Sequence, residues 1–190
     1  MKVIICYPPL SSHKGSATLG QNRQFQYFKE PTYIYPVVPA QAATLLQKAG
    51  HEVIWLDCLA EGISYDRFIE IIEQEKPDLI AFETKTPVVK QHWKIINDLR
   101  PTSHVLPPTA QAPLTVLFGD HVTALPEESL QNCKVDFVLT GGDYDFLLLN
   151  LCNYLNERPL DSGLCPSLGV NGRPLDSGLC PSLGVNGRPL

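Results

Sequence analysis

Residues 79–86 read LIAFETKT, an apolar run with a polar end that lies between two helical patterns. On the upstream side, Phe68, Ile71 and Ile72 recur at helical spacing. On the downstream side, the segment 88–99 has the same periodicity. A short apolar strand between two helices is typical of a βαβ unit in a parallel sheet.

The same alternation of apolar runs and helical patterns extends to about residue 157. It predicts five strands, at Val3–Cys6, Val53–Leu56, Leu79–Phe82, Leu114–Phe118 and Val135–Thr140. It also predicts helices near 39–49, 65–76, 88–99, 126–130 and 144–155, and long loops at 10–35 and 101–113. Because the strands are apolar throughout, both faces of the sheet should be buried. We therefore predict an α/β fold, a doubly wound, Rossmann- or flavodoxin-like parallel sheet with strand order 2-1-3-4-5.

The end of the chain has a different composition. Residues 158–172 read RPLDSGLCPSLGVNG, residues 173–187 repeat them without a change, and a further copy begins at 188. A solenoid needs about three or more stacked copies, and this segment is rich in Pro, Gly and Ser. We predict one domain, 1–157, followed by a disordered tail of tandem repeats, 158–190. A protein-binding tail is the alternative.

Composition excludes several functions. The formal net charge is -5 and no basic block stands out, which argues against nucleic-acid binding. No apolar run approaches the roughly 18 residues of a membrane span, and the N-terminus lacks a signal-peptide cleavage site. The 6 cysteines form no CxxC pair and have no zinc spacing. We expect free thiols in a cytoplasmic protein, with no metal held by protein side chains.

In a doubly wound sheet, ligands bind beyond the carboxyl ends of the strands. Common ligand motifs are absent there: Pro8-Pro9 replaces the GxGxxG of a dinucleotide site, and no GxxxxGK[ST] occurs. A receiver domain would need an acidic pair after the first strand, where the chain has Tyr7-Pro8. The strand ends therefore favour another cofactor.

The strand-end residues resemble the N-terminal cobalamin-binding domain of B12-dependent radical SAM proteins. The matching segments, which together cover about residues 1–157, are Pro8-Pro9, Tyr35-Pro36, Ala49-Gly50-His51-Glu52-Val53, Asp57, Lys76-Pro77-Asp78-Leu79, Thr84-Lys85-Thr86, Gly119-Asp120-His121-Val122-Thr123-Ala124-Leu125-Pro126-Glu127-Glu128 and Val135-Asp136-Phe137-Val138. Each segment is a weak signal alone, whereas their order and spacing make the set fairly specific.

This resemblance implies a corrinoid over the strand ends, with its nucleotide tail beside the sheet. Glycines would let the backbone approach the ligand closely, and threonine hydroxyls would bond its amides or phosphate. The cofactor contacts that it implies are Pro9, Thr84, Lys85, Thr86, Gly119, Asp120, His121, Val122, Thr123, Gly141 and Gly142. Ordinary turn chemistry is the alternative explanation for the glycines, above all for Gly141 and Gly142.

The sequence also departs from the family. Phe118 and Asp120 stand where the family usually has a glycine and a proline, and Gly141-Gly142-Asp143 replaces Gly-Glu-Gly-Glu after the last strand. These changes support an alternative function, a degenerate, non-binding domain used for interaction or regulation.

No histidine is expected on the cobalt. The DxHxxG motif is absent, and His13 in SSHKG lacks the preceding aspartate that would orient its imidazole. We expect His13 to be an exposed loop residue, and His121 to pack or hydrogen-bond within its loop.

The catalytic half of the family is missing from the sequence. No CxxxCxxC triplet occurs, so no iron–sulfur cluster is expected in this chain. The resemblance implies a detached or truncated module, whose partner would be a radical SAM catalytic domain or protein. A third hypothesis is an enzyme in its own right, in which Glu83, Asp120 and His121 converge as acid and base.

Overall fold

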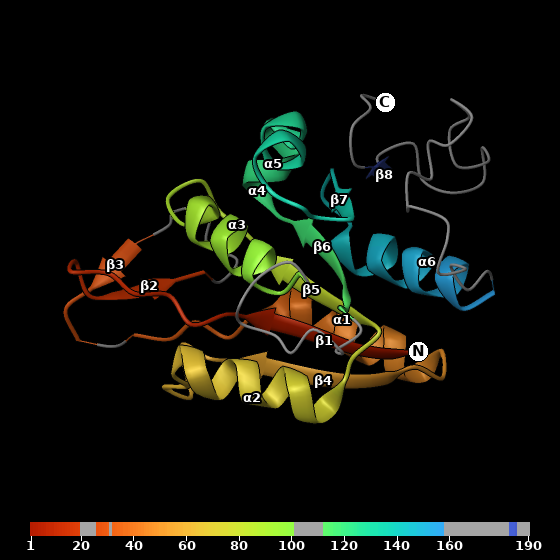
Figure 1. The fold of residues 1–190 in the computed structure, drawn as a ribbon, viewed down its shortest axis with the longest axis horizontal. Helices are drawn as coiled ribbons and strands as arrows, with labels where there is room; N and C mark the ends of the chain where they lie inside the picture. Colours follow the sequence, from red (N-terminus) through yellow and green to blue (C-terminus); the bar gives the residue numbers. More distant parts are fainter. Residues whose placement is uncertain (20–25, 31, 101–111, 158–182, 186–190) are drawn as a thin grey trace.

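The structure of the chain is a computed structural model, which describes residues 1–19, 26–30, 32–100, 112–157 and 183–185. Its centre is a sheet of parallel strands (Figure 1): β1 Lys2–Tyr7, β4 Glu52–Asp57, β5 Leu79–Glu83, β6 Leu114–Phe118 and β7 Phe137–Leu139. They lie in the order β4-β1-β5-β6-β7. In the numbering of the prediction this is 2-1-3-4-5, so the doubly wound α/β fold is confirmed.

Helices cover both faces of this sheet, because strand side chains alternate between two apolar cores. Ile4 and Cys6 of β1 pack in the core formed with α2 (Tyr65–Glu75) and α3 (Val89–Asp98). The side chains of Val3 and Ile5 pack on the opposite face with α1 (Val37–Lys48) and α6 (Tyr144–Glu157). All four β1 side chains are fully buried, as the apolar pattern predicts.

The element boundaries differ slightly from the prediction. The first helix begins at Val37 rather than near Pro39, and β7 has three residues instead of the predicted six. Between β6 and β7 lie two short helices, α4 (Asp120–Ala124) and α5 (Pro126–Asn132), of which the sequence predicted only the second. A helix of five residues is too short for its periodicity to be recognised.

A hairpin lies within the segment 10–35, which was predicted as a loop. Its strands β2 (Ser16–Thr18) and β3 (Gln26–Phe28) pair antiparallel, with Ala17 opposite Tyr27. Each strand has three residues, too few for an alternating pattern to stand out. The hairpin projects from the carboxyl end of β1, at the left of Figure 1. The loop prediction is therefore wrong at these two strands.

A buried ion pair fixes the opposite, amino edge of β6 and β7. Arg100 Nη2 lies 2.5 Å from Asp136 Oδ2, and the same oxygen accepts hydrogen bonds from the Thr115 amide at 2.7 Å and the Thr115 hydroxyl at 3.0 Å. The guanidinium also donates to the Lys134 carbonyl. This network joins the C-terminal end of α3 to both strands.

Most of the repeat tail lies outside the described residues, as does the loop 101–111. The described part of the tail is β8 (Leu183–Val185), which pairs antiparallel with β7 and adds a sixth strand to the sheet. The predicted disorder of the tail is otherwise untested. Among the described residues, no helix has the length and apolarity required to cross a bilayer.

Candidate functional site

The carboxyl ends of the parallel strands lie side by side, as predicted. Tyr7 pairs with Asp57, Glu83 with Phe118, and Phe118 with Leu139. The helices that follow the neighbouring strands β1 and β5, α1 and α3, pack on opposite faces of the sheet. Ligands of doubly wound folds bind at such a switch point. This carboxyl edge is therefore the candidate site.

A buried polar cluster spans the edge from β1 to the turn after β6. The Tyr7 hydroxyl donates a 2.5 Å hydrogen bond to Glu83 Oε2. Lys85 Nζ lies 3.9 Å from Glu83 Oε1 and 2.8 Å from Asp120 Oδ2. The Lys85 and Glu83 side chains are each 7% exposed, whereas that of Asp120 is 57% exposed. Lys85 and Asp120, both predicted contacts, thus bind each other across the site.

Burial determines the protonation of this cluster. It raises the pKa of Glu83, while the Tyr7 hydrogen bond and the Lys85 ammonium lower that pKa and Asp120 raises it. Burial and the adjacent Glu83 carboxylate raise the pKa of Tyr7, so the phenol keeps its proton and is the donor. The Glu83 carboxylate is thus held within the protein, between the Tyr7 phenol and the Lys85 ammonium.

Gly119 has a structural role that requires no ligand. Its φ is +116°, and an added Cβ would overlap the Thr84 carbonyl oxygen and lie 3.1 Å from the Thr84 nitrogen. The Thr84 amide donates a 2.8 Å hydrogen bond to the Phe118 carbonyl. The close approach of the turns after β5 and β6 therefore requires glycine here. Contact between Gly119 and a cofactor stays a prediction.

Thr84 has an unsatisfied hydroxyl. Its side chain is completely buried, and Oγ1 has no hydrogen-bond partner among the described residues. A buried polar atom without a partner costs about 1–3 kcal/mol, and such atoms are uncommon in native proteins. A ligand atom or water that reached this hydroxyl would remove the penalty.

His121 is enclosed between elements rather than presented at the edge. Its Nδ1 lies 3.2 Å from the Thr86 hydroxyl, its Nε2 lies 3.4 Å from Glu128 Oε2, and its ring centre is 6.0 Å from that of Trp93. The residue is 2% exposed. Burial lowers the pKa of His121 although Glu128 raises it, so the imidazole is neutral at pH 7. The prediction that His121 packs and hydrogen-bonds within the protein is supported.

Thr123 binds the protein's own backbone. Its Oγ1 lies 2.9 Å from the Gly119 carbonyl oxygen, 3.2 Å from both the nitrogen and the carbonyl oxygen of Gly141, and 3.1 Å from the Tyr144 hydroxyl. A hydroxyl has one donor and two acceptor positions. Those positions are used, so Thr123 connects α4 to the turn before α6 and has no free position for a ligand.

The other predicted contacts differ in accessibility. Gly142 is exposed, and a Cβ there would meet no atom within 4 Å. Pro9, Thr86 and Gly141 are partly or fully accessible. Val122 is fully buried in the core that contains α3. The predicted contacts thus include residues that a ligand could reach and residues that are buried within the protein.

Sequence reasoning missed a group of exposed apolar side chains at this edge. Helices that follow parallel strands begin at the carboxyl edge, and most of these residues lie at or before such helix starts. They are Tyr33 (54% exposed), Ile34 (37%), Tyr35 (72%) and Val37 (41%) around the start of α1, Leu125 (51%) between α4 and α5, and Phe146 (57%) in the first turn of α6. Only Tyr35-Pro36 gave a sequence signal.

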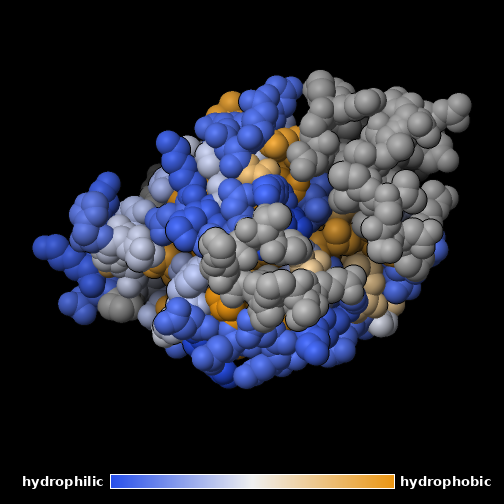
Figure 2. All heavy atoms as spheres, in the orientation of Figure 1, coloured by the Kyte–Doolittle hydropathy of each residue, from blue (hydrophilic) through white to orange (hydrophobic). Residues whose placement is uncertain are grey.

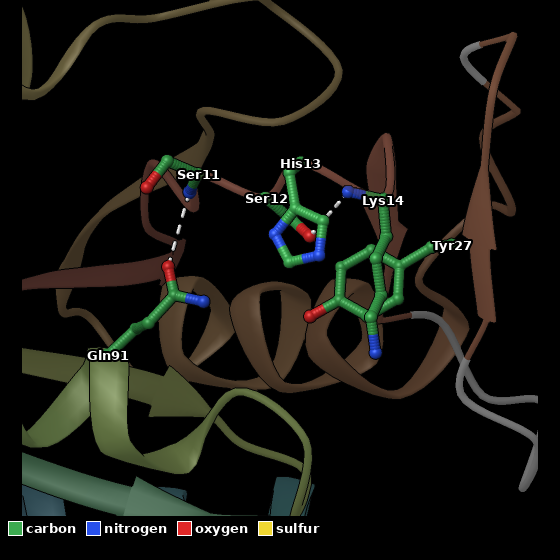
Figure 3. Close-up of a pocket in the computed structure, with 6 residues that line it drawn as sticks. All are labelled: Ser11, Ser12, His13, Lys14, Tyr27 and Gln91. Atoms are coloured by element: carbon green, nitrogen blue, oxygen red, sulfur yellow. Dashed lines mark hydrogen bonds between the residues drawn. The ribbon is translucent and has the colours of Figure 1, made fainter.

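A second missed feature is an open hollow beyond β1 and β5. It is lined by Ser11, Ser12, His13, Lys14, Tyr27 and Gln91, which Figure 3 shows in close-up. His13 is exposed, as predicted. No carboxylate lines the hollow with it.

The acid–base arrangement that would support independent catalysis is not assembled. Glu83 and Asp120 both approach Lys85, but His121 is held by Thr86 and faces Glu128 instead. Within the described part of the chain, no group of three or more His, Cys, Asp or Glu residues could hold a metal ion.

The fold is similar to that of TsrM from Kitasatospora setae, a radical S-adenosylmethionine methyltransferase. A TsrM structure with tryptophan substrate and a SAM analogue bound matches with a TM-score of 0.57 and 16% identity, over 82% of this chain and 26% of TsrM. A second, with cobalamin and a [4Fe-4S] cluster bound, matches with a TM-score of 0.56 and 17% identity, over 82% and 24%. What is shared is the fold.

This chain spans about a quarter of the length of TsrM. No protein-family profile and no curated protein matches its sequence. The similarity therefore shows a shared α/β fold and does not by itself assign a ligand.

Proposed function

We propose that the chain is a cobalamin-binding module that holds the corrinoid over the carboxyl edge of its sheet. The observation on which this depends is the fold, shared over 82% of the chain with a protein that binds cobalamin. Doubly wound sheets bind ligands at this edge. A bound corrinoid would supply a cobalt centre able to transfer an alkyl group.

The residues at the edge fit a large, flat ligand with an apolar face and polar rim. The Thr84 hydroxyl has no partner, and the accessible Thr86 lies in the same turn. Gly142 leaves open space beside the last strand. The exposed side chains of Tyr35 and Phe146 provide apolar surface, as cofactor sites commonly do.

We propose a radical SAM catalytic domain or protein as a partner of the module. The 190 residues contain no CxxxCxxC triplet for an iron–sulfur cluster, and they correspond to about a quarter of the length of TsrM. The thiols of Cys6, Cys58, Cys133 and Cys152 are free and buried. They are compatible with the reducing cytoplasm that we propose as the location.

Two contacts favour the alternative, a degenerate domain that binds no corrinoid. The Lys85–Asp120 ion pair crosses the edge at 2.8 Å, and the Thr123 hydroxyl is fully used within the protein. A ligand would have to fit beside both contacts or open the first of them.

Titration with hydroxocobalamin, followed by absorbance, distinguishes the two functions. We expect saturable binding to the full chain and at least about tenfold weaker binding to Gly142→Val, because added bulk would overpack the ligand. The control is Ala49→Val, which also introduces a valine and adds two methyl groups at an exposed position at the C-terminal end of α1, on the opposite edge of the sheet. Absence of binding to the full chain would overturn the cobalamin function and leave the non-binding alternative. Equal affinities for all three proteins would place the corrinoid elsewhere.

A further inference from the structure

The hollow beyond β1 and β5 is a second feature at the switch point of the sheet. It has a volume of about 560 Å³ and is open to solvent. Ser11 to Lys14 follow β1, Tyr27 belongs to β3, and Gln91 lies in the first turn of α3, directly after β5. Three separate elements thus line one space beyond the two strands between which the chain order reverses.

The lining consists of hydrogen-bond donors without a carboxylate. Gln91 Oε1 accepts the Ser11 amide at 3.2 Å, which orients the carboxamide and leaves its NH₂ group for a ligand. Figure 3 shows the His13 imidazole between Gln91 and the pair formed by Lys14 and Tyr27. Lys14 Nζ lies 5.9 Å from the centre of the Tyr27 ring and has no ion-pair partner among the described residues.

The charge of the surrounding sequence agrees with this lining. The segment 10–29 contains Lys14, Arg23, Lys29 and His13 but no Asp or Glu, in a chain with a net charge of -5. The hairpin end of the molecule, at the left of Figure 2, is largely hydrophilic. The hollow therefore lies in a stretch of sequence, 10–29, that has basic residues and no acidic ones.

We propose that this hollow is an anion subsite that takes a phosphate group. Lys14 supplies the charge, while His13, the serine hydroxyls and the Gln91 amide donate hydrogen bonds from different directions, which suits a group with several acceptor oxygens. The phosphate belongs either to the nucleotide tail of a corrinoid or to a separate phosphorylated molecule. Neither the fold nor the proposed function assigns these residues, and the subsite does not depend on corrinoid binding.

The test measures inorganic phosphate binding to the full chain by calorimetry and by the shift of the His13 imidazole signal in NMR, with chloride at equal ionic strength as reference. Lys14→Gln should weaken phosphate binding about tenfold, near the lower limit for a hydrogen bond to a charged group. Lys29→Gln is the matched control, since it removes the same charge from the same hairpin at an exposed residue outside the hollow. If phosphate affinity is the same in all three proteins, the subsite does not exist.

Two further ligands identify the source of the phosphate. Hydroxocobalamin carries a phosphodiester in its nucleotide tail, and cobinamide lacks that tail. A loss of hydroxocobalamin affinity in Lys14→Gln, with cobinamide affinity unchanged, assigns the subsite to the corrinoid. A loss of phosphate affinity in Lys14→Gln, with hydroxocobalamin affinity unchanged, assigns the subsite to a separate phosphorylated molecule. If phosphate binds and neither corrinoid does, the subsite stands and the proposed cobalamin function fails.

Discussion

Gly119 faces the backbone of Thr84 so closely that a Cβ at position 119 would overlap the Thr84 carbonyl oxygen. The contact joins the turns after β5 and β6, at the centre of the candidate site. The φ angle of Gly119, +116°, also lies in a region that residues with a side chain disfavour. The glycine that most resembles a cofactor-binding residue in the sequence is thus already required by the fold.

Replacement of Gly119 should therefore destabilise the protein without any ligand present. We expect Gly119→Ala to lower the free energy of unfolding by more than about 2 kcal/mol, because backbone strain and the clash act together. Gly142→Ala is the control, since its Cβ would meet no atom within 4 Å. Urea unfolding of both variants is the measurement. An unchanged midpoint for Gly119→Ala would show that the turns separate easily.

Replacement of His92 by an apolar residue should stabilise the protein. It is completely buried, and neither ring nitrogen has a hydrogen-bond partner among the described residues. We expect His92→Leu to stabilise the protein by about 1–2 kcal/mol at pH 7, because it removes buried polar atoms that are unsatisfied. The exposed His13 provides the comparison: His13→Gln should leave the unfolding midpoint unchanged.

The same residue should make stability depend on pH. Burial lowers the pKa of His92 from 6.5 to about 3 in the folded protein, so between these values the unfolded chain takes up the proton and the folded chain does not. Stability should then fall as pH decreases from 6.5 toward 3, by up to about 1.4 kcal/mol per pH unit from this group. His92→Leu should show a shallower slope in urea titrations across this range. Parallel profiles for the two proteins would contradict the burial of His92.

The sequence predicted those features that depend on local pattern. Apolar runs located the strands, and their ends located the candidate edge. The surroundings of His121 could not be predicted, because they depend on how Trp93 of α3 and Glu128 of α5 meet the five residues of α4. The contact of Gly119 with Thr84 joins two separate turns, and a local pattern cannot distinguish such an approach from one toward a ligand. The hollow involves the hairpin, whose strands are too short to recognise.

Asp136 should be one of the most sensitive acidic residues in the protein. It accepts hydrogen bonds from Arg100 and from two Thr115 atoms, and its side chain is 11% exposed. Asp136→Ala would leave a largely buried guanidinium without its charge partner, at a loss of about 3 kcal/mol. Glu70→Ala breaks the Arg67–Glu70 pair, in which both side chains are more than half exposed, and should change stability by less than about 0.5 kcal/mol. Thermal unfolding of the two variants compares these positions directly.

Thr123 should affect the order of the turn between β7 and α6. Thr123→Val keeps the shape but removes the hydroxyl that binds Gly119, Gly141 and Tyr144, with an expected loss of about 1–2 kcal/mol. Hydrogen exchange at the Gly141 amide should accelerate, since that N–H donates to Thr123 Oγ1 at 3.2 Å. Thr123→Ser should restore slow exchange. Equal exchange rates of the Gly141 amide in Thr123→Val and the wild-type protein would mean that the Thr123 hydroxyl does not hold the turn.

The repeat tail should be dispensable for folding of the domain 1–157. The core closes before the tail begins: Leu155 is 4% exposed, and Asn156 accepts a hydrogen bond from the N-terminal amine at 3.3 Å. The described part of the tail adds only the three residues of β8 to the edge of β7. Deletion of residues 158–190 should therefore shift the thermal midpoint by less than about 4 °C, or about 1 kcal/mol for a domain of this size. A larger decrease would show that the tail contributes more to the fold than the β8 pairing.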